Sequence, residues 1–272
     1  MEENQEFRRY LIDVDYDPEG MYINHDFMGE KYIAEHSHEK VQFLYTEGGV
    51  VHIKTETTNY FLPARHYMLI APGVKHCIFP SSEKVIMRNV YFPVLDSNPG
   101  FYKETAIYPV NDFLLHFLMY TNKWNGPVPK SSEKDYSILK AFACLLPDLS
   151  QHRLHFSLPL TSNERLNKVL KYLEENVGHQ VLFDDLATTF GFSSRSLSRL
   201  FQKELKMSFV QYFILFRMLR ALHLIAEKKL TISEIAYAVG YSSLPTFSNT
   251  FAKIIGVRPT EYAAAKGIFS DK

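Results

Sequence analysis

The chain has 272 residues, 46% of them hydrophobic, and its 30 basic and 30 acidic residues balance to a formal charge of +0. This length accommodates two domains, and the composition allows each to bury a core. The two cysteines, Cys77 and Cys144, exclude a disulfide framework and fit a reducing compartment. The segment MEENQEFRRY lacks the apolar stretch of a signal peptide. No apolar run approaches the length of a membrane helix, so we expect a soluble, cytoplasmic protein without a membrane partner.

The charge is divided unevenly along the chain. Residues 161–272 hold 15 of the 30 basic and 10 of the 30 acidic residues, which gives this part +5 and leaves −5 for residues 1–160. A basic half favours an anionic partner, whereas the acidic half argues against one polyanion lying along the entire protein.

Residues 20–95 show the pattern of a strand-rich domain. Short apolar runs rich in Val, Ile, Tyr and Phe alternate with turn-forming residues; the runs are VQFLY, VVHIK, YFL, YMLIA and VIMRNVYF, and the turns are Gly48-Gly49, Thr57-Thr58-Asn59, Pro72-Gly73 and Pro80-Ser81-Ser82. Many short strands at this spacing predict a sandwich or barrel.

Two segments with helical spacing follow, DFLLHFLMYTNKW from Asp112 and EKDYSILKAFACLLPDL from Glu133. In the second, an apolar stripe recurs every three to four residues; its members are Ile138, Phe142, Leu145 and Leu149. This stripe fits either packing against the strands or contact with a second copy of the chain, and periodicity does not distinguish the two.

The segment HFSLPLTSN, residues 155–163, interrupts the periodicity and predicts the boundary between two domains, 1–155 and 163–272. After it every periodic segment is helical. The predicted helices are Asn163–Asn176, Phe183–Phe190, Ser194–Leu205, Phe209–Glu227, Ile232–Val239, Ser243–Ile255 and Pro259–Lys266.

One unit occurs twice in the second half. GFSSRSLSRLF, from Gly191, and GYSSLPTFSNTF, from Gly240, both begin with Gly, an aromatic residue and Ser-Ser. In each, a glycine suited to the left-handed conformation ends a short helix, and a serine caps the next one. A short helix, a tight turn and a second helix predict a helix-turn-helix motif.

The helical period separates an inner from an outer face in both second helices. Leu197, Leu200 and Phe201 share the inner face of the first, while Phe247, Thr250 and Phe251 share that of the second. Polar side chains on the outer faces can bond to base edges or phosphates in a major groove. The candidate DNA-binding residues are Ser194, Arg195, Ser198, Arg199, Gln202, Ser243, Pro245, Ser248, Asn249 and Lys253.

The helix Phe209–Glu227 connects the two motifs. Its 19 residues span about 28 Å at about 1.5 Å per residue, and a major groove recurs on one face of DNA about every 34 Å. A rigid connection of this length predicts that two recognition helices read successive grooves.

Residues 163–266 resemble the DNA-binding domain of AraC/XylS-family transcriptional regulators. The matching segments are DLATTFGFSSRSLSRLFQKELKMSFVQY, RMLRALHLI and EIAYAVGYSSLPTFSNTFAKIIGVRPTEY. The resemblance implies base contacts in the first motif from Arg195, Ser198 and Arg199, and in the second from Pro245, Ser248 and Asn249. Four positions depart from the family pattern: Leu182 replaces a Ser/Thr cap, Lys206 a glycine, Asn249 an arginine and Ala263 the final arginine.

The strand-rich half resembles the cupin-like sensor domains fused to such regulators. The resemblance rests on His36-Ser37-His38, Gln42, and Pro72-Gly73-Val74-Lys75-His76. It implies a metal site formed by His36, His38 and His76, with Gln42 in the place of the usual glutamate. The same residues could instead line a metal-free pocket for an organic ligand or lie at a wet barrel mouth, so no cofactor is required. The candidate ligand-binding residues are Tyr32, His36, His38, Gln42, Tyr45, His66, His76 and Tyr91.

Together these patterns predict a cupin-like β-barrel followed by helices, then an all-α domain with two helix-turn-helix motifs. We expect a ligand-responsive transcriptional activator. Its expected partners are double-stranded DNA, RNA polymerase, a second copy of the chain and a small effector such as a sugar or aromatic acid. Two alternatives remain: a metal-dependent cupin enzyme with a DNA-binding appendage, and a constitutive DNA-binding protein whose barrel only dimerises.

Overall fold

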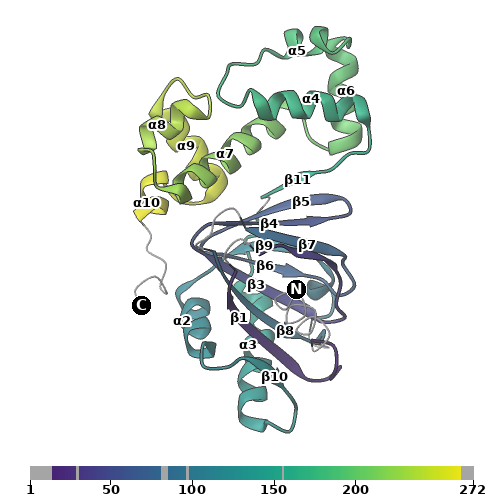
Figure 1. The fold of residues 1–272 in the computed structure, drawn as a ribbon, viewed down its shortest axis with the longest axis vertical. Helices are drawn as coiled ribbons and strands as arrows, with labels where there is room; N and C mark the ends of the chain where they lie inside the picture. The colour runs from purple at the N-terminus through teal and green to yellow at the C-terminus, as the bar shows by residue number, and fades with distance from the viewer. Residues whose placement is uncertain (1–13, 29–30, 81–84, 96–97, 155, 265–272) are drawn as a thin grey trace. The chain divides into compact units, whose positions relative to one another are not determined.

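The computed structural model describes residues 14–28, 31–80, 85–95, 98–154 and 156–264 (Figure 1). The chain divides into two compact units, one made of residues 1–55 and 62–155 and the other of residues 56–61 and 156–272. The expected turn residues Ser81 and Ser82 and the end of the helix expected at Pro259–Lys266 lie outside the described residues.

The strands form two antiparallel sheets. The first has the order β10-β1-β8-β3-β6-β9; its strands are β1 (Met21–Phe27), β3 (Val41–Glu47), β6 (His66–Ile70), β8 (Ile86–Phe92), β9 (Ala106–Pro109) and β10 (Gly126–Val128). The second has the order β11-β5-β4-β7-β2; its strands are β2 (Ile33–His36), β4 (Val50–Thr55), β5 (Thr58–Pro63), β7 (His76–Pro80) and β11 (Ser157–Pro159). The prediction of a strand-rich domain is confirmed. The short strands β9, β10 and β11 lie beyond the region that the pattern covered, and β11 falls in the stretch that we expected to be irregular.

Strand β3 shows how side chains alternate between the two faces of the first sheet. On one face, the ring of Phe43 packs against Phe142 at 5.1 Å between centroids. On the other face lies Gln42, which is opposite Tyr91 on β8 and Ile70 on β6. Because directly opposed residues of antiparallel strands point to the same side, Gln42 and Tyr91 share the face that does not contact Phe142.

Phe142 belongs to α3 (Glu133–Leu149), which follows the short helix η1 (Phe101–Lys103) and α2 (Asp112–Thr121). Helix α2 ends at Thr121, before the predicted end at Trp124. The predicted stripe on α3 is corrected: the buried residues are Leu139, Phe142, Ala143 and Leu146, whereas Leu145 is 41% exposed. Both stripes have helical spacing, so periodicity alone did not select the face that packs on the sheet.

The helical unit confirms the predicted order of helices. They are α4 (Glu164–Glu175), α5 (Phe183–Thr189), α6 (Ser194–Leu205), α7 (Phe209–Glu227), α8 (Ile232–Ala238), α9 (Leu244–Ile255) and α10 (Pro259–Ala264). Helix α7 packs its first turn on the first motif, since the ring of Phe209 lies 5.0 Å from Phe183 and 6.0 Å from Phe201.

The expectation that no apolar run approaches the length of a membrane helix is wrong for α7. Its 19 residues, with a mean hydropathy of 1.4 over the best window, are long and apolar enough to cross a membrane, but half of that window is buried inside the protein. Leu215, Met218 and Leu222 are among its buried residues. The apolar composition is explained by packing on both sides of a central helix.

Candidate functional site

The first helix-turn-helix motif consists of α5 and α6. Gly191 ends the α5 turn with φ +69°, a left-handed conformation that glycine adopts without a steric penalty. Ser193 then caps α6, because its hydroxyl accepts a hydrogen bond from the Ser196 amide. Leu197 and Phe201 are fully buried, which fixes the face of α6 that points away from the core.

That outer face of α6 carries the predicted DNA-binding side chains. Arg195, Ser198, Arg199 and Gln202 are exposed, and Ser194 is partly buried. The Ser194 hydroxyl donates to Asp184 on α5, so it ties the two helices of the motif together. Two guanidinium groups and an amide on one solvent-facing helix surface are suited to base edges and phosphates.

The second motif consists of α8 and α9. Thr231 caps α8 in a reciprocal capping box with Glu234. Gly240 takes φ +82°, and Ser243 is the N-cap residue of α9, although its side chain makes no capping bond. Phe247 and Phe251 are fully buried. The outer face of α9 exposes Pro245, Asn249 and Lys253, with Ser243 and Ser248 partly buried.

A residue that the sequence did not single out joins this outer face. The guanidinium of Arg258, between α9 and α10, donates through Nη1 to Asn249 Oδ1 at 2.9 Å. Asn249 occupies the position where the resembled family has arginine, so Arg258 supplies a guanidinium next to that position. Helix α9 ends at Gly256, which has φ +90° and lies two residues before Arg258.

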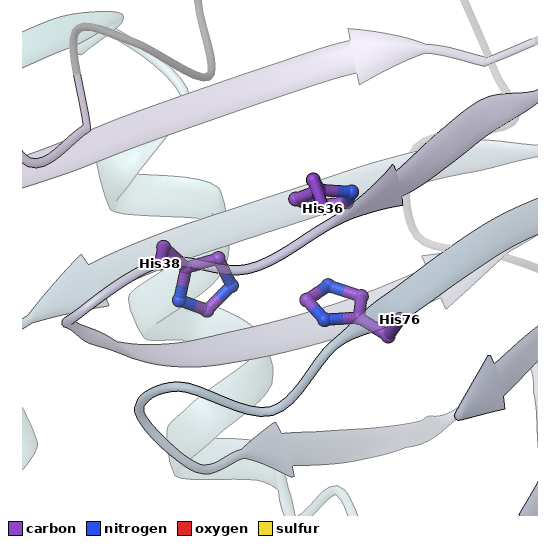
Figure 2. Close-up of side chains that lie close together, drawn as sticks. All are labelled: His36, His38 and His76. Carbon is purple, nitrogen blue, oxygen red and sulfur yellow. The ribbon is translucent and has the colours of Figure 1, made fainter. Parts of the chain in front are cut away.

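The β-rich unit brings three histidines together (Figure 2). His36 ends β2, His38 follows it in the loop, and His76 begins β7, directly opposite His36. One ring nitrogen from each of the three lies within 4.8 Å of the others. His38 and His76 are buried and His36 is half-buried. The three imidazoles point toward one another (Figure 2), although His36 and His38 do not share a strand, because β2 ends at His36.

Each of these imidazoles makes the same hydrogen bond to the backbone. The Nδ1 atoms of His36, His38 and His76 contact the carbonyl oxygens of Ala34, Lys40 and Val74 at 2.8, 2.7 and 2.8 Å. A carbonyl oxygen only accepts, so each Nδ1 carries the proton and each neutral ring keeps its lone pair on Nε2.

The local environment keeps the rings of His36 and His76 neutral. Burial lowers the pKa of His76 to about 3, and the neighbouring His36 and His38 add to this effect. Burial also lowers the pKa of His36. At neutral pH both rings are therefore in the form that binds metal ions or accepts hydrogen bonds.

The remaining candidate ligand-binding residues fall into two groups. Gln42 and Tyr91 lie at the cluster, since Gln42 Oε1 is 3.0 Å from His38 Nε2 and the Tyr91 ring is 5.2 Å from the His38 ring. His66, Tyr45 and Tyr32 do not. His66 begins β6, four residues from Ile70, the partner of Gln42, or about 13 Å along the strand.

Tyr45 and Tyr32 lie away from the cluster for different reasons. Tyr45 is three residues from Gln42 on β3 and so points to the opposite face of the sheet, where its hydroxyl donates to Glu47 Oε1 at 2.8 Å. Tyr32 is 60% exposed, and its ring lies 6.4 Å from that of Phe79, which is three residues from His76 on β7 and so points to the opposite face. An odd separation along a strand reverses the side-chain direction, and the sequence did not show that β3 is buried on both faces.

A pocket of about 230 Å³ lies nearby in the same unit, lined by Val14, Tyr16, Asp17, Met21, Tyr22, Lys40 and Pro127. Lys40 is only 3% exposed, and its Nζ donates to the carbonyls of Val14 and Asp17 at 2.5 and 2.8 Å. Burial lowers the pKa of Lys40, against the opposing effect of Asp15. No sequence pattern indicated this pocket, because a lone lysine beside a turn is usually a surface residue.

Comparison with known proteins agrees with both halves of this description. Residues 18–163 match the family described as AraC-like ligand binding domain, and residues 186–265 match the family described as helix-turn-helix domain. The first match alone spans more than half of the 272 residues. The chain therefore belongs to the AraC family of transcriptional regulators, with a ligand-binding domain before a DNA-binding domain. This family consists of regulators and not enzymes, which removes the enzyme alternative.

Individual relatives match to different extents. The chain is 32% identical over 101 residues to the regulator GbdR of Pseudomonas aeruginosa, covering 37% of this chain and only 28% of that protein. It is 23% identical over 229 residues to the regulator NimR of Escherichia coli, covering 84% of this chain and 81% of the relative. A regulator structure from Chromobacterium violaceum is 32% identical over 38% of this chain and 92% of that one, with a TM-score of 0.36.

Proposed function

We propose that this protein is a cytoplasmic, homodimeric transcriptional activator that binds two successive major grooves and responds to a small effector. The observation that carries the proposal is the duplicated motif: in both α6 and α9 the aromatic residues are buried while the polar face stays exposed. The helix α7 that joins them spans about 28 Å, which suits grooves about 34 Å apart.

The DNA half of the proposal is tested by mapping where the full-length protein binds in the genome and footprinting the sites found. Two protected stretches per chain, separated by about 10 base pairs, are expected. A single protected stretch would show that only one motif reads DNA. Run-off transcription with RNA polymerase from a mapped promoter then tests activation, and repression at such promoters would overturn the activator assignment.

The effector is proposed to be a small organic acid, of the aromatic-acid type rather than the sugar type. Lys40 supports this choice, because two of its three N–H groups bond to carbonyls at the pocket wall and an ammonium favours a carboxylate. Thermal-shift screening of the full chain against aromatic acids and sugars tests the class. A ligand at 100 times its Kd stabilises by about 2.7 kcal/mol, and Lys40→Met removes this stabilisation if the acid binds there.

The dimer is proposed to form through exposed apolar side chains on α2 and α3. These helices are neighbours, since the rings of Phe117 and Phe142 stack at 4.2 Å. Phe113, Tyr120 and Leu145 are 49%, 43% and 41% exposed. A single exposed apolar side chain is ordinary, whereas several on neighbouring helices are typical of an interaction surface. Leu145→Glu should shift the mass measured by light scattering from dimer to monomer, whereas the exposed Leu182→Glu in the helical unit should not.

A further inference from the structure

The three-histidine cluster contains a buried acceptor atom that no group of the described residues satisfies. With each Nδ1 proton donated to a backbone carbonyl, the lone pairs that remain are those of three Nε2 atoms. His76 is fully buried, and among the described residues its Nε2 has no hydrogen-bond partner. A buried acceptor left in this state costs free energy unless something else occupies the site.

Gln42 reinforces this arrangement. Its Nε2 donates to Asn89 Oδ1 at 2.8 Å, so its Oε1 faces His38 Nε2 at 3.0 Å. Both facing atoms are acceptors when the ring is neutral. If the side-chain amides of Gln42 and Asn89 were both flipped, Gln42 would instead donate an N–H···N bond to His38. A cation at the cluster favours the unflipped orientation, because Gln42 Oε1 then faces the positive charge.

We propose that His36, His38 and His76 bind a divalent transition-metal ion through Nε2, with the amide oxygen Gln42 Oε1 beside it as the fourth donor atom. Three neutral imidazoles suit Zn²⁺, Fe²⁺, Co²⁺ or Ni²⁺ and not Mg²⁺ or Ca²⁺, which require carboxylates and other oxygen ligands. The backbone carbonyls that accept from the three Nδ1 atoms orient the rings, as such partners do in known metal sites.

The distances are compatible with an ion. Nitrogens bound to one ion at about 2.0–2.1 Å lie about 3.0–3.4 Å apart, and the ring nitrogens here lie within 4.8 Å. The ring centroids of His36 and His76 are already 4.2 Å apart. Side-chain movements of about 1 Å would therefore bring the ring nitrogens to the separation found around one ion. Four protein donors leave coordination positions open on an ion that takes five or six ligands, and an effector with oxygen donors can occupy them.

The test uses the full-length protein, stripped with a chelator and titrated with Co²⁺ at neutral pH. We expect binding of one Co²⁺ per chain, visible absorption bands of a nitrogen-ligated ion, and displacement by Zn²⁺. His36→Ala and His76→Ala should each weaken binding by at least about 100-fold. His66→Ala is the matched control, because His66 is also a buried histidine of this unit but lies about 13 Å from Gln42.

Gln42→Glu gives an independent check that does not depend on removing a buried ring. A carboxylate at this position should raise Co²⁺ affinity, since an anionic oxygen is a better ligand than an amide. The proposal would be overturned if Gln42→Glu left the Co²⁺ affinity unchanged and His36→Ala bound Co²⁺ as tightly as the wild type. Such a result would mean that the ion only adsorbs to the protein surface. Circular dichroism confirms that each variant is folded. The readout is separate from DNA binding, so failure of the proposed regulatory function would not affect it.

Discussion

Gly240 lies directly against the guanidinium of Arg217. A Cβ added at Gly240 would come within 2.5 Å of Arg217 Nη2 and 2.8 Å of the Val177 carbonyl oxygen. Arg217 itself donates to the carbonyls of Val177 and His179 at 3.2 and 2.7 Å. One side chain of α7 thus links the segment after α4 to the turn of the second motif, which helps to hold the two motifs in one unit.

Gly240→Ala is therefore expected to destabilise the protein by about 3 kcal/mol or more, because strain at φ +82° adds to a clash with backbone. Gly191→Ala is the matched control: it has φ +69° and no atom within 4 Å of the added Cβ, so it should lose only about 1–2 kcal/mol. Urea unfolding of both variants measures the difference. If both variants lost the same free energy of unfolding, the backbone at Val177 would have moved to relieve the clash with the added Cβ.

Arg199→Ala should weaken binding to a mapped operator by about 1–3 kcal/mol, with a much smaller effect on random DNA. The reason is that Arg199 is exposed on the outer face of α6, where a guanidinium can reach base edges. Lys54→Ala, which removes one positive charge from β4 in the other unit, is the control. Equal losses on both DNAs in a fluorescence-anisotropy titration would make Arg199 a phosphate contact.

Arg258→Ala should also weaken operator binding, by about 1 kcal/mol or more. The hydrogen bond from Arg258 to Asn249 Oδ1 places the guanidinium beside α9. Since the two residues act together, Asn249→Ala and Arg258→Ala should be non-additive by more than about 0.5 kcal/mol in a double-mutant cycle. Additive losses would show that the pair does not act as a unit on DNA.

Lys206→Gly should stabilise the protein by about 1 kcal/mol. Lys206 ends α6 with φ +55°, a left-handed conformation that costs a residue with a side chain about 1–2 kcal/mol, whereas the corresponding C-cap of α9 is Gly256. Lys206→Ala removes the same charge and keeps the strain, so it should show no such gain. A melting temperature that rises equally in both variants would point to charge and not to backbone conformation.

The lowered pKa of His66 predicts that the free energy of unfolding decreases in mild acid. Burial lowers its pKa from 6.5 to about 4, and its Nδ1 contacts the Ala64 carbonyl. The unfolded chain therefore binds a proton that the folded chain resists, so the stabilisation is complete above pH 6.5 and falls by about 3 kcal/mol as the pH drops to about 4. His66→Gln should flatten this dependence in urea unfolding across that range, and the exposed His116→Gln should not. Parallel curves for wild type and His66→Gln would exclude His66 as the cause.

The helices of the second half could be predicted from the sequence almost residue by residue. The bounds of α6 and α7, the capping box at Thr231 and the left-handed glycines Gly191 and Gly240 follow from interactions between residues close in the chain. Such local rules do not depend on what packs above them.

Features that join distant segments of the chain could not be predicted and depend on the folded structure. It brought His76 to His36 across β2 and β7, turned Tyr45 away from Gln42, buried Lys40 beside a pocket and placed Arg258 against Asn249. On α3 the buried face contains Leu139 and Leu146, and not the predicted Ile138 and Leu145. The physical reason is that periodicity specifies which residues share a face, whereas the surface that covers the face is supplied by another part of the chain.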